Sequence, residues 1–223
     1  MNSDYFKNYA ICRNNFFNNP DAIVELSKKQ NYERKFYCPG MRTKNILSSP
    51  DRETRDFAEY LADRLWREVF PGIYDFTLDI NFHINESCSD SQADIGWIHY
   101  DWADLAGMIY LTPTESNFEN GTSIFNCKTD VNLPTVDVES RKQFNLTGVV
   151  TEEYIKDLKE NWNYFSESIK FGNEYNRLVA YDAKMFHRPN NLEINSMKRL
   201  ALLFFIKDYK VALPKKDKHS KWD

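Results

Sequence analysis

One histidine and one aspartate, His99 and Asp101, stand a single residue apart in the aromatic stretch 96–102. If this stretch is extended, alternate side chains project to opposite faces, so the imidazole and the carboxylate point the same way while Tyr100 points to the other face. A second imidazole, from His187, would complete a set of two histidines and one carboxylate. Such a set leaves coordination positions open and suits non-haem Fe(II). The three residues predict a metal site, provided that the fold brings His187 to the other two.

An isolated pair such as His99 and Asp101 is more often structural than metal-binding, so the rest of the chain must support the assignment. His83 is the other histidine in the central part of the chain. It alternates with apolar residues, which favours a surface or hydrogen-bonding role. If the interior of the predicted barrel is itself polar, His83 and Asn81 lie inside it instead.

Composition indicates one globular domain. The 223 residues are 42% hydrophobic and 15% aromatic, with only seven glycines, which excludes a disordered or low-complexity chain. A formal net charge of −4 argues against a nucleic-acid partner. Because the sequence shows neither an apolar leader nor a run of 18 apolar residues, we expect a cytoplasmic protein that does not associate with a membrane.

Two helices are predicted in the N-terminal third of the chain. Asparagines followed by a proline at 18–20 form a start signal for a short helix that ends near Lys29. A second start signal precedes apolar residues at helical spacing, which predicts a helix over 51–69. The Pro71-Gly72 pair would end this helix.

From residue 74 the apolar period changes to two, which predicts a half-buried strand up to residue 85. Further strands are predicted at 106–112, 122–125, 176–181 and 199–206. The last of these is apolar on both faces, as expected for a strand between a barrel interior and covering helices.

The expected organisation is a single domain over residues 1–223. Residues 1–73 would form a support of helices and strands, and residues 74–126 and 175–210 would form the core. The intervening segment, 127–174, is polar, and residues 151–153 offer a helix cap followed by acidic residues. This segment is predicted to be an insertion that carries at least one helix.

The order of the motifs resembles that of the 2-oxoglutarate and Fe(II)-dependent oxygenases, most nearly their prolyl 4-hydroxylase-like branch. The matching pieces are, in order, 98–101, 108–112, 120–125, 176–182, 186–187 and 198–202. The resemblance implies a mainly β fold with flanking helices, namely a double-stranded β-helix, also called a jelly roll or cupin-like barrel. It covers the chain from 96 to 206 and leaves residues 1–73 and the insertion outside.

Carried over residue by residue, the resemblance implies that His99, Asp101 and His187 bind Fe(II). It further implies that Arg199 holds the distal carboxylate of 2-oxoglutarate and that Tyr110 donates its hydroxyl to the same carboxylate. A guanidinium can grip a carboxylate through two parallel hydrogen bonds, which a lysine does less specifically. The open alternatives for Arg199 are a surface ion pair or replacement by Lys198 as the carboxylate holder.

The implied reaction uses O2 and couples oxidative decarboxylation of 2-oxoglutarate to hydroxylation of a C–H bond. Because Asp101 fills the place that a halide would need, hydroxylation is favoured over halogenation. The substrate would be a peptide or a small, amino-acid-like molecule, and the resemblance does not decide between them. The competing hypothesis is a non-catalytic jelly-roll module that binds a structural metal or a ligand. Such a module has no need for a carboxylate clamp beside its metal, so Arg199 and Tyr110 discriminate between the two.

Overall fold

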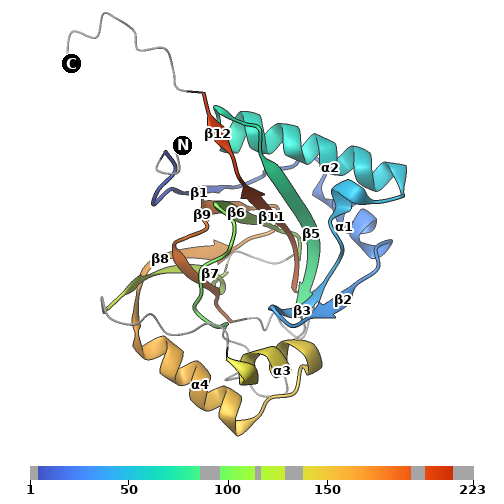
Figure 1. Ribbon diagram of the computed structural model, residues 1–223. Helices are drawn as coiled ribbons and strands as arrows, with labels where there is room; N and C mark the ends of the chain where they lie inside the picture. Colours follow the sequence, from blue (N-terminus) through green and yellow to red (C-terminus); the bar gives the residue numbers. More distant parts are fainter. Residues whose placement is uncertain (1–4, 86–95, 114–116, 129–137, 192–198, 213–223) are drawn as a thin grey trace, which may run out of the picture.

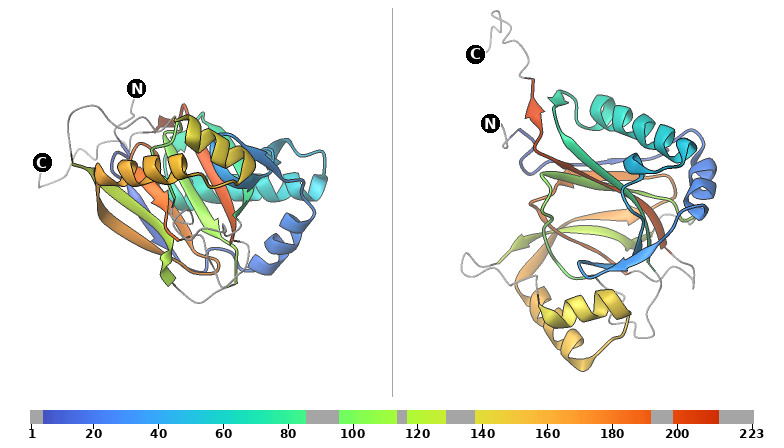
Figure 2. Two further views of the ribbon diagram at one scale, coloured as in Figure 1. Left: turned by 90° about the horizontal axis from the view of Figure 1, so that it is seen from below. Right: turned by 45° about the vertical axis from the view of Figure 1, so that its right-hand side comes forward.

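The computed structural model describes residues 5–85, 96–113, 117–128, 138–191 and 199–212. Two antiparallel sheets lie one over the other, and helices cover the outside (Figures 1 and 2). The larger sheet has seven strands and the smaller has three. This arrangement is a double-stranded β-helix with flanking helices, which confirms the predicted fold class.

The strands of the larger sheet are, in spatial order, β1 (Ala10–Arg13), β9 (Leu178–Asp182), β6 (Leu105–Tyr110), β11 (Arg199–Lys207), β5 (Thr77–Asn85), β3 (Cys38–Arg42) and β2 (Glu33–Lys35). The smaller sheet consists of β10 (Phe186–Pro189), β7 (Asn117–Cys127) and β8 (Phe165–Asn173). A separate pair is formed by β4 (Ile73–Tyr74) and β12 (Lys210–Val211). The helices are α1 (Pro20–Lys28), α2 (Arg52–Arg64), α3 (Glu139–Thr147) and α4 (Glu152–Asn163), with a 3₁₀ turn η1 (Ile46–Ser48) and a π-helical turn η2 (Leu65–Val69).

The two N-terminal helices begin where the sequence predicts. The side chain of Asn19 accepts a hydrogen bond from the N–H of Ala22 at the start of α1, and Asp51 caps α2 in the same way. The helical segment after Asp51 extends to Val69 as predicted, but its last turn is the π-helical η2. None of the helices that the structure describes is both long and apolar enough to cross a bilayer.

Helices α1 and α2 cover the outer face of the larger sheet (Figures 1 and 2). Apolar side chains of the sheet and of the helical segment form one cluster there. Ile80 and Phe82 of β5, Phe204 of β11, and Leu61 are fully buried in it. These sheet residues are the even-numbered members of their strands, so the predicted alternation on β5 is confirmed.

The odd-numbered residues of β5 point to the inner side of the sheet, and those from Asp79 to Asn85 are not on the surface. Asp79, His83 and Asn85 line a cavity between the two sheets, and Asn81 is buried as well. The surface role that we favoured for His83 is therefore wrong, whereas the hydrogen-bonding role is confirmed by its contact with the carbonyl oxygen of Pro39, and the alternative of a polar interior holds. The reason is that the smaller sheet closes over this face, which a period of two cannot reveal.

Residues 127–174 contribute a strand as well as helices. After α3 and α4, which confirm the expected helical content, β8 pairs antiparallel with β7 in the smaller sheet. The close approach of β8 depends on Gly121, because a Cβ there would lie 1.7 Å from the carbonyl oxygen of Phe171. The segment thus has two parts, a pair of helices and a strand of the jelly roll.

Candidate metal centre

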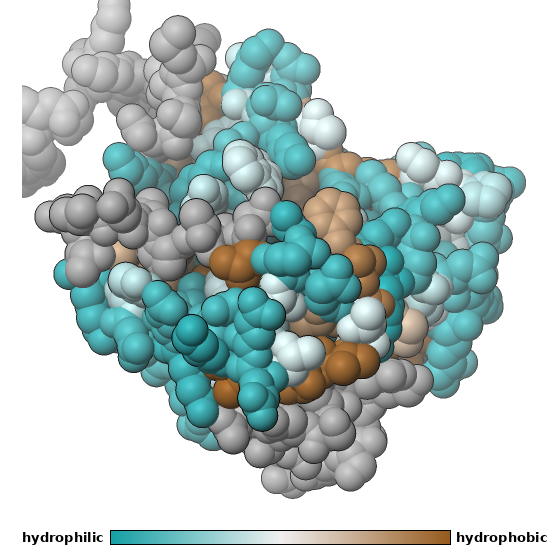
Figure 3. Space-filling view, turned by 60° about the horizontal axis from the view of Figure 1, so that its bottom comes forward, coloured by the Kyte–Doolittle hydropathy of each residue, from teal (hydrophilic) through white to brown (hydrophobic). Residues whose placement is uncertain are grey.

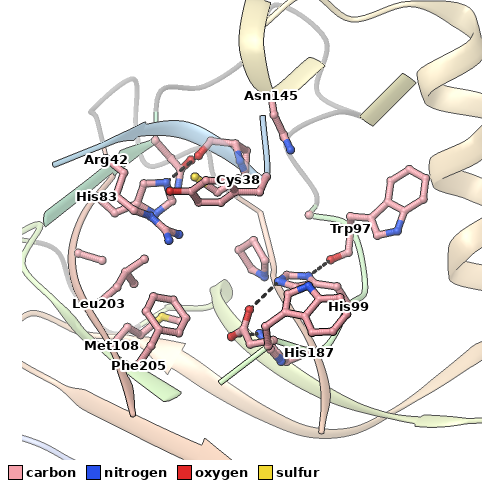
Figure 4. A pocket seen from close by; sticks show the side chains of 18 of the residues that line it. Cys38, Arg42, His83, Trp97, His99, Met108, Asn145, His187, Leu203 and Phe205 are labelled. Atoms are coloured by element: carbon pink, nitrogen blue, oxygen red, sulfur yellow. Dashed lines mark hydrogen bonds and ion pairs between the residues drawn. The ribbon is translucent and has the colours of Figure 1, made fainter. Parts of the chain in front are cut away.

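His99, Asp101 and His187 converge on one side of the cavity between the sheets, where Figure 4 labels the two histidines. Their potential ligand atoms all lie within 4.8 Å of one another. Nε2 of His99 is 3.8 Å from Oδ1 of Asp101, and Nε2 of His187 is 3.3 Å from Oδ2. Ligand atoms about 2.1 Å from a shared divalent ion and at right angles to one another lie about 3 Å apart. The spacing therefore fits a single ion after small side-chain adjustments.

The backbone joins the two histidines directly. The N–H of His99 donates to the carbonyl of His187 at 3.0 Å, and the N–H of His187 donates to the carbonyl of His99 at 2.7 Å. Among residues 96–102, only His99 takes part in β pairing, so this stretch is a single bridge and not a regular strand. The bridge brings together the two imidazoles that the sequence separates.

Each histidine directs its Nε2 toward the Asp101 carboxylate, where a shared metal would lie. Nδ1 of His99 lies 2.8 Å from the carbonyl oxygen of Trp97, and Nδ1 of His187 lies 2.9 Å from that of Met185. A carbonyl oxygen only accepts hydrogen bonds, so Nδ1 carries a proton in each ring. Second contacts of this kind fix the tautomer and the ring orientation of metal-binding histidines.

The electrostatics favour the metal-binding forms of His99 and Asp101. Burial, with the nearby His187 ring, lowers the pKa of His99 to about 3. Burial opposes ionisation of Asp101, but the two imidazoles beside it outweigh that effect and lower its pKa to about 2. A neutral imidazole and an ionised carboxylate are the forms that coordinate a divalent metal.

Helix α4 fixes the segment that carries His99 and Asp101. The Asn161 side chain accepts a hydrogen bond from the N–H of Ile98 at 2.9 Å and donates one to its carbonyl oxygen at 3.0 Å. Trp162 donates its indole N–H to the carbonyl oxygen of Gly96 at 3.2 Å. The helical part of 127–174 is thus attached to the backbone immediately before His99 and Asp101.

Helices α3 and α4 also wall the cavity, through Trp97. The Trp97 ring packs against Tyr154 of α4 in a cluster that includes Phe144 of α3, and all three residues line the cavity. On this side of the molecule the surface is mainly hydrophilic, with patches of apolar side chains between the polar ones (Figure 3). The two helices therefore lie between the segment 96–102 and the solvent on this side of the protein.

Arg199 lies on β11 and is only 3% exposed, which excludes the alternative of a surface ion pair. Its guanidinium carbon is 5.2 Å from the centroid of the Tyr110 ring, and its Nη2 lies 3.4 Å from the carbonyl oxygen of Gly121. Its Nη1 is buried without a hydrogen-bond partner, and no carboxylate in the described part of the chain pairs with it. A buried cation without a counter-ion is costly, so this position fits an anionic ligand.

The second predicted clamp residue, Tyr110, is fully buried beside Arg199 and lies on β6. Its hydroxyl donates to Oγ1 of Thr122 at 2.8 Å. Burial raises the pKa of the Tyr110 phenol, so the group stays a hydrogen-bond donor. To donate to a ligand carboxylate, the hydroxyl would have to turn from Thr122.

The cavity has a volume of about 560 Å³, and the triad and Arg199 both line it. Cavities of this size hold small organic ligands. Further charged side chains line it that the sequence did not single out as site residues, among them Arg42 on β3 and Asp79 on β5, with Arg141, Lys142 and Lys207. The only sequence signal for Asp79 was its position on the polar side of an alternating strand, and Arg42 gave none.

Neither a protein-family model nor a curated protein sequence matches this chain. Solved structures do match in fold. HygX from Streptomyces hygroscopicus, solved with nickel, 2-oxoglutarate and hygromycin B bound, has a TM-score of 0.56 at 10% identity, over 90% of this chain and 83% of that one. A prolyl hydroxylase from Trichoplax adhaerens, in complex with a peptide of the hypoxia inducible factor oxygen degradation domain, gives 0.52 at 12% identity, over 91% and 84%.

AviO1 from Streptomyces viridochromogenes Tue57 has a TM-score of 0.51 at 9% identity, over 93% of each chain. In all three comparisons the superposition covers most of this chain and most of the other protein's chain. At these identities the likeness establishes a common fold. The resemblance that the motif order indicated is therefore confirmed at the level of the fold.

Proposed function

We propose that this protein is an Fe(II)- and 2-oxoglutarate-dependent dioxygenase that hydroxylates a C–H bond of a peptide or a small molecule. One observation carries the proposal: the His99, Asp101 and His187 triad opens on the same cavity as the buried, unpaired Arg199. Structural metal sites are usually closed by four protein ligands, whereas a triad on a cavity wall leaves coordination positions for other molecules.

In this proposal Nε2 of His99, Nε2 of His187 and the Asp101 carboxylate would hold Fe(II). Arg199 would bind the distal carboxylate of 2-oxoglutarate, which would give its Nη1 the partner that it lacks. Tyr110 would add a hydrogen bond by turning its hydroxyl from Thr122. Bound together, the iron and the keto acid would supply the oxidising chemistry, in which O2 hydroxylates the substrate while 2-oxoglutarate becomes succinate and CO2.

The remaining work of the protein is to bind, orient and shield. The carbonyl oxygens of Trp97 and Met185 keep both imidazoles in the orientation that presents Nε2. Trp97 and the helices α3 and α4 would limit the access of water from one side. The Asp101 carboxylate would occupy the coordination position that a halide would need, which supports hydroxylation over halogenation.

The substrate class has support from two sources. The HygX structure contains hygromycin B and the Trichoplax prolyl hydroxylase contains a peptide, so this fold accommodates both a small molecule and a peptide. The competing hypothesis, a non-catalytic metal- or ligand-binding module, gives no role to the buried cation Arg199. The position of Arg199 beside the triad thus supports an enzyme over a binding module.

The test is the weak visible charge-transfer band of an Fe(II) and 2-oxoglutarate chelate, recorded without oxygen. We expect the band in the wild type and in Asp63→Ala, a control that removes an exposed carboxylate on α2, and we expect its loss in Asp101→Ala. Succinate release on admission of O2 would then establish turnover. A wild type without the band, or a band of equal strength in Asp101→Ala, would contradict the proposal and leave a binding module.

A further inference from the structure

Arg42 presents a second cation to the cavity. Its guanidinium points into the space that the metal triad borders from another side (Figure 4). The guanidinium carbon lies 5.4 Å from the centroid of the Phe205 ring and 5.8 Å from that of Tyr37. Nε of Arg42 is buried and has no hydrogen-bond partner, and no carboxylate in the described residues forms an ion pair with this side chain. Arg42 is therefore oriented by aromatic rings and forms no ion pair within the described residues, although its charge acts through space on the Asp101 carboxylate.

Asp79 places in the same cavity a carboxyl group that has no ion-pair partner among the described residues. Its Oδ1 is buried and makes no hydrogen bond, and the described residues include no ion-pair partner for it. Asp79 is the cross-strand partner of Phe205, the ring that Arg42 approaches. Two opposite charges thus flank one aromatic ring without pairing with each other. A buried polar atom without a hydrogen-bond partner lowers stability, and a ligand of complementary charge would remove that cost.

The proposed cofactor set does not account for these two groups. 2-Oxoglutarate has one distal carboxylate, and Arg199 would bind it. His83 lies between the two arginines in the sheet, paired with Arg42 on one side and with Ala201 on the other. Burial and the two guanidinium groups lower the pKa of His83 to about 3, so it is neutral and provides no counter-charge. Arg42 is therefore available to an anion other than the keto acid.

We propose that the substrate is a small molecule of the α-amino-acid type, whose carboxylate binds Arg42 and whose ammonium group binds Asp79. This inference rests on the proposed function, because it names the substrate class of the same cavity. A residue inside a peptide carries neither charge, since its amino and carboxyl groups are in amide bonds. The unpaired charges thus favour a free amino acid, or the amino-acid end of a larger small molecule, over a peptidyl substrate.

The experiment measures binding by calorimetry in the full-length protein loaded with Ni(II) and 2-oxoglutarate, so that no turnover occurs. The probes are the free L-amino acids, their carboxamides and their N-acetyl derivatives. We expect at least one free amino acid to bind, with its amide and its N-acetyl derivative at least tenfold weaker. Arg42→Leu should abolish the preference for the acid over the amide, and Arg42→Lys should restore part of it. Asp79→Asn should abolish the preference for the free amine over the N-acetyl form.

Arg52→Leu is the matched control, because Arg52 lies exposed on α2 and far from the cavity lining. It should retain both preferences. Thermal unfolding of each variant verifies that it is folded, and the two variants of Arg42 separate loss of charge from loss of packing. Affinity for 2-oxoglutarate alone should be the same in Arg42→Leu as in the wild type.

Several outcomes overturn the inference. These are equal binding of acids and amides, unchanged selectivity in Arg42→Leu, absence of amino-acid binding, and a large loss of 2-oxoglutarate affinity in Arg42→Leu. The last outcome would assign Arg42 to the keto acid. If the wild type fails to bind 2-oxoglutarate, the proposed function itself is wrong. Normal 2-oxoglutarate binding without selective amino-acid binding rejects only the substrate class.

Discussion

Strands β5 and β11 have two faces with opposite properties. On the outer face, Ile80, Phe82 and Phe204 pack into an apolar cluster with the covering helices. On the inner face, the same strands carry Asp79 and Arg199. Consecutive residues of these strands thus alternate between the apolar outer face and the polar inner face, because successive side chains of a strand point to opposite sides of the sheet.

The two faces differ in how fully their groups are satisfied. Several inner-face atoms are buried without hydrogen-bond partners, whereas the outer-face residues of these strands are apolar and have no such atoms. The inner-face atoms belong to Asp79, Asn81, Asn85 and Arg199. Unsatisfied buried groups lower stability. The outer face therefore stabilises the sheet, whereas the inner face lowers its stability and would be satisfied by the ligands that we propose.

The largest expected effect is on the outer face. Phe204→Ala removes a fully buried ring and leaves a cavity in the apolar cluster, which should lower the free energy of unfolding by about 3–5 kcal/mol. Urea denaturation measures this change. Phe118→Ala, which removes a ring that is 57% exposed, is the control and should change stability by less than about 0.5 kcal/mol. An equal loss in the free energy of unfolding at the two positions would contradict the view that the outer face stabilises the sheet.

On the inner face, Arg199→Met is expected to weaken ligand binding without lowering the stability of the protein. Loss of the charged hydrogen bonds should weaken 2-oxoglutarate binding by about tenfold to a hundredfold, as calorimetry on the metal-loaded protein would measure. Removal of a buried, unpaired charge should leave the free energy of unfolding without ligand unchanged, or raise it by about 1 kcal/mol. Arg199→Lys keeps the charge and should bind 2-oxoglutarate better than Arg199→Met. A comparable weakening of metal binding would show that Arg199 has a different role.

The third effect is a pH dependence that belongs to the inner face. Unfolded His83 takes up a proton near its usual pKa of about 6.5, whereas the folded protein resists protonation down to a pKa of about 3. The contribution of His83 to the free energy of unfolding is therefore fully present above pH 6.5. It falls as the pH decreases toward 3, and the loss at pH 5 is about 2 kcal/mol.

His83→Gln should remove this part of the pH dependence, because glutamine does not titrate. In the native protein, Nε2 of His83 donates to the carbonyl oxygen of Pro39 at 2.6 Å, and the amide of glutamine offers a donor in its place. Urea denaturation at pH 7 and pH 5 gives the comparison. If the wild type and the variant lose the same stability between these pH values, His83 is not the buried neutral group described here.

The outer face and the helix starts were predictable because their signals are local. The apolar positions of β5 and the caps Asn19 and Asp51 involve only neighbours along the chain. The triad and Arg199 were found through the order of motifs over a long stretch. The motif order indicated which residues could form a site, but it gave no information on whether their side chains lie close together in the fold.

Arg42 and Asp79 could not be predicted in this way. A polar residue that alternates with apolar ones indicates a face in water, and whether that face meets water or a cavity depends on a second sheet. Strand β8 was missed for a related reason. The residues from Ser166 to Ile169 are exposed, so the strand has no alternation, and it is positioned by its partner β7 at Gly121.

The mutual hydrogen bonds of His99 and His187 give the site its own reporter. Each amide proton is held by the carbonyl oxygen of the other residue, so neither can exchange with deuterium from solvent unless the two segments separate. The exchange rates of these two amides thus measure the opening of the bridge that carries the imidazoles. An ion held by both rings would slow the exchange of both amides together. Metal binding could therefore be detected from amide exchange alone, before any substrate is known.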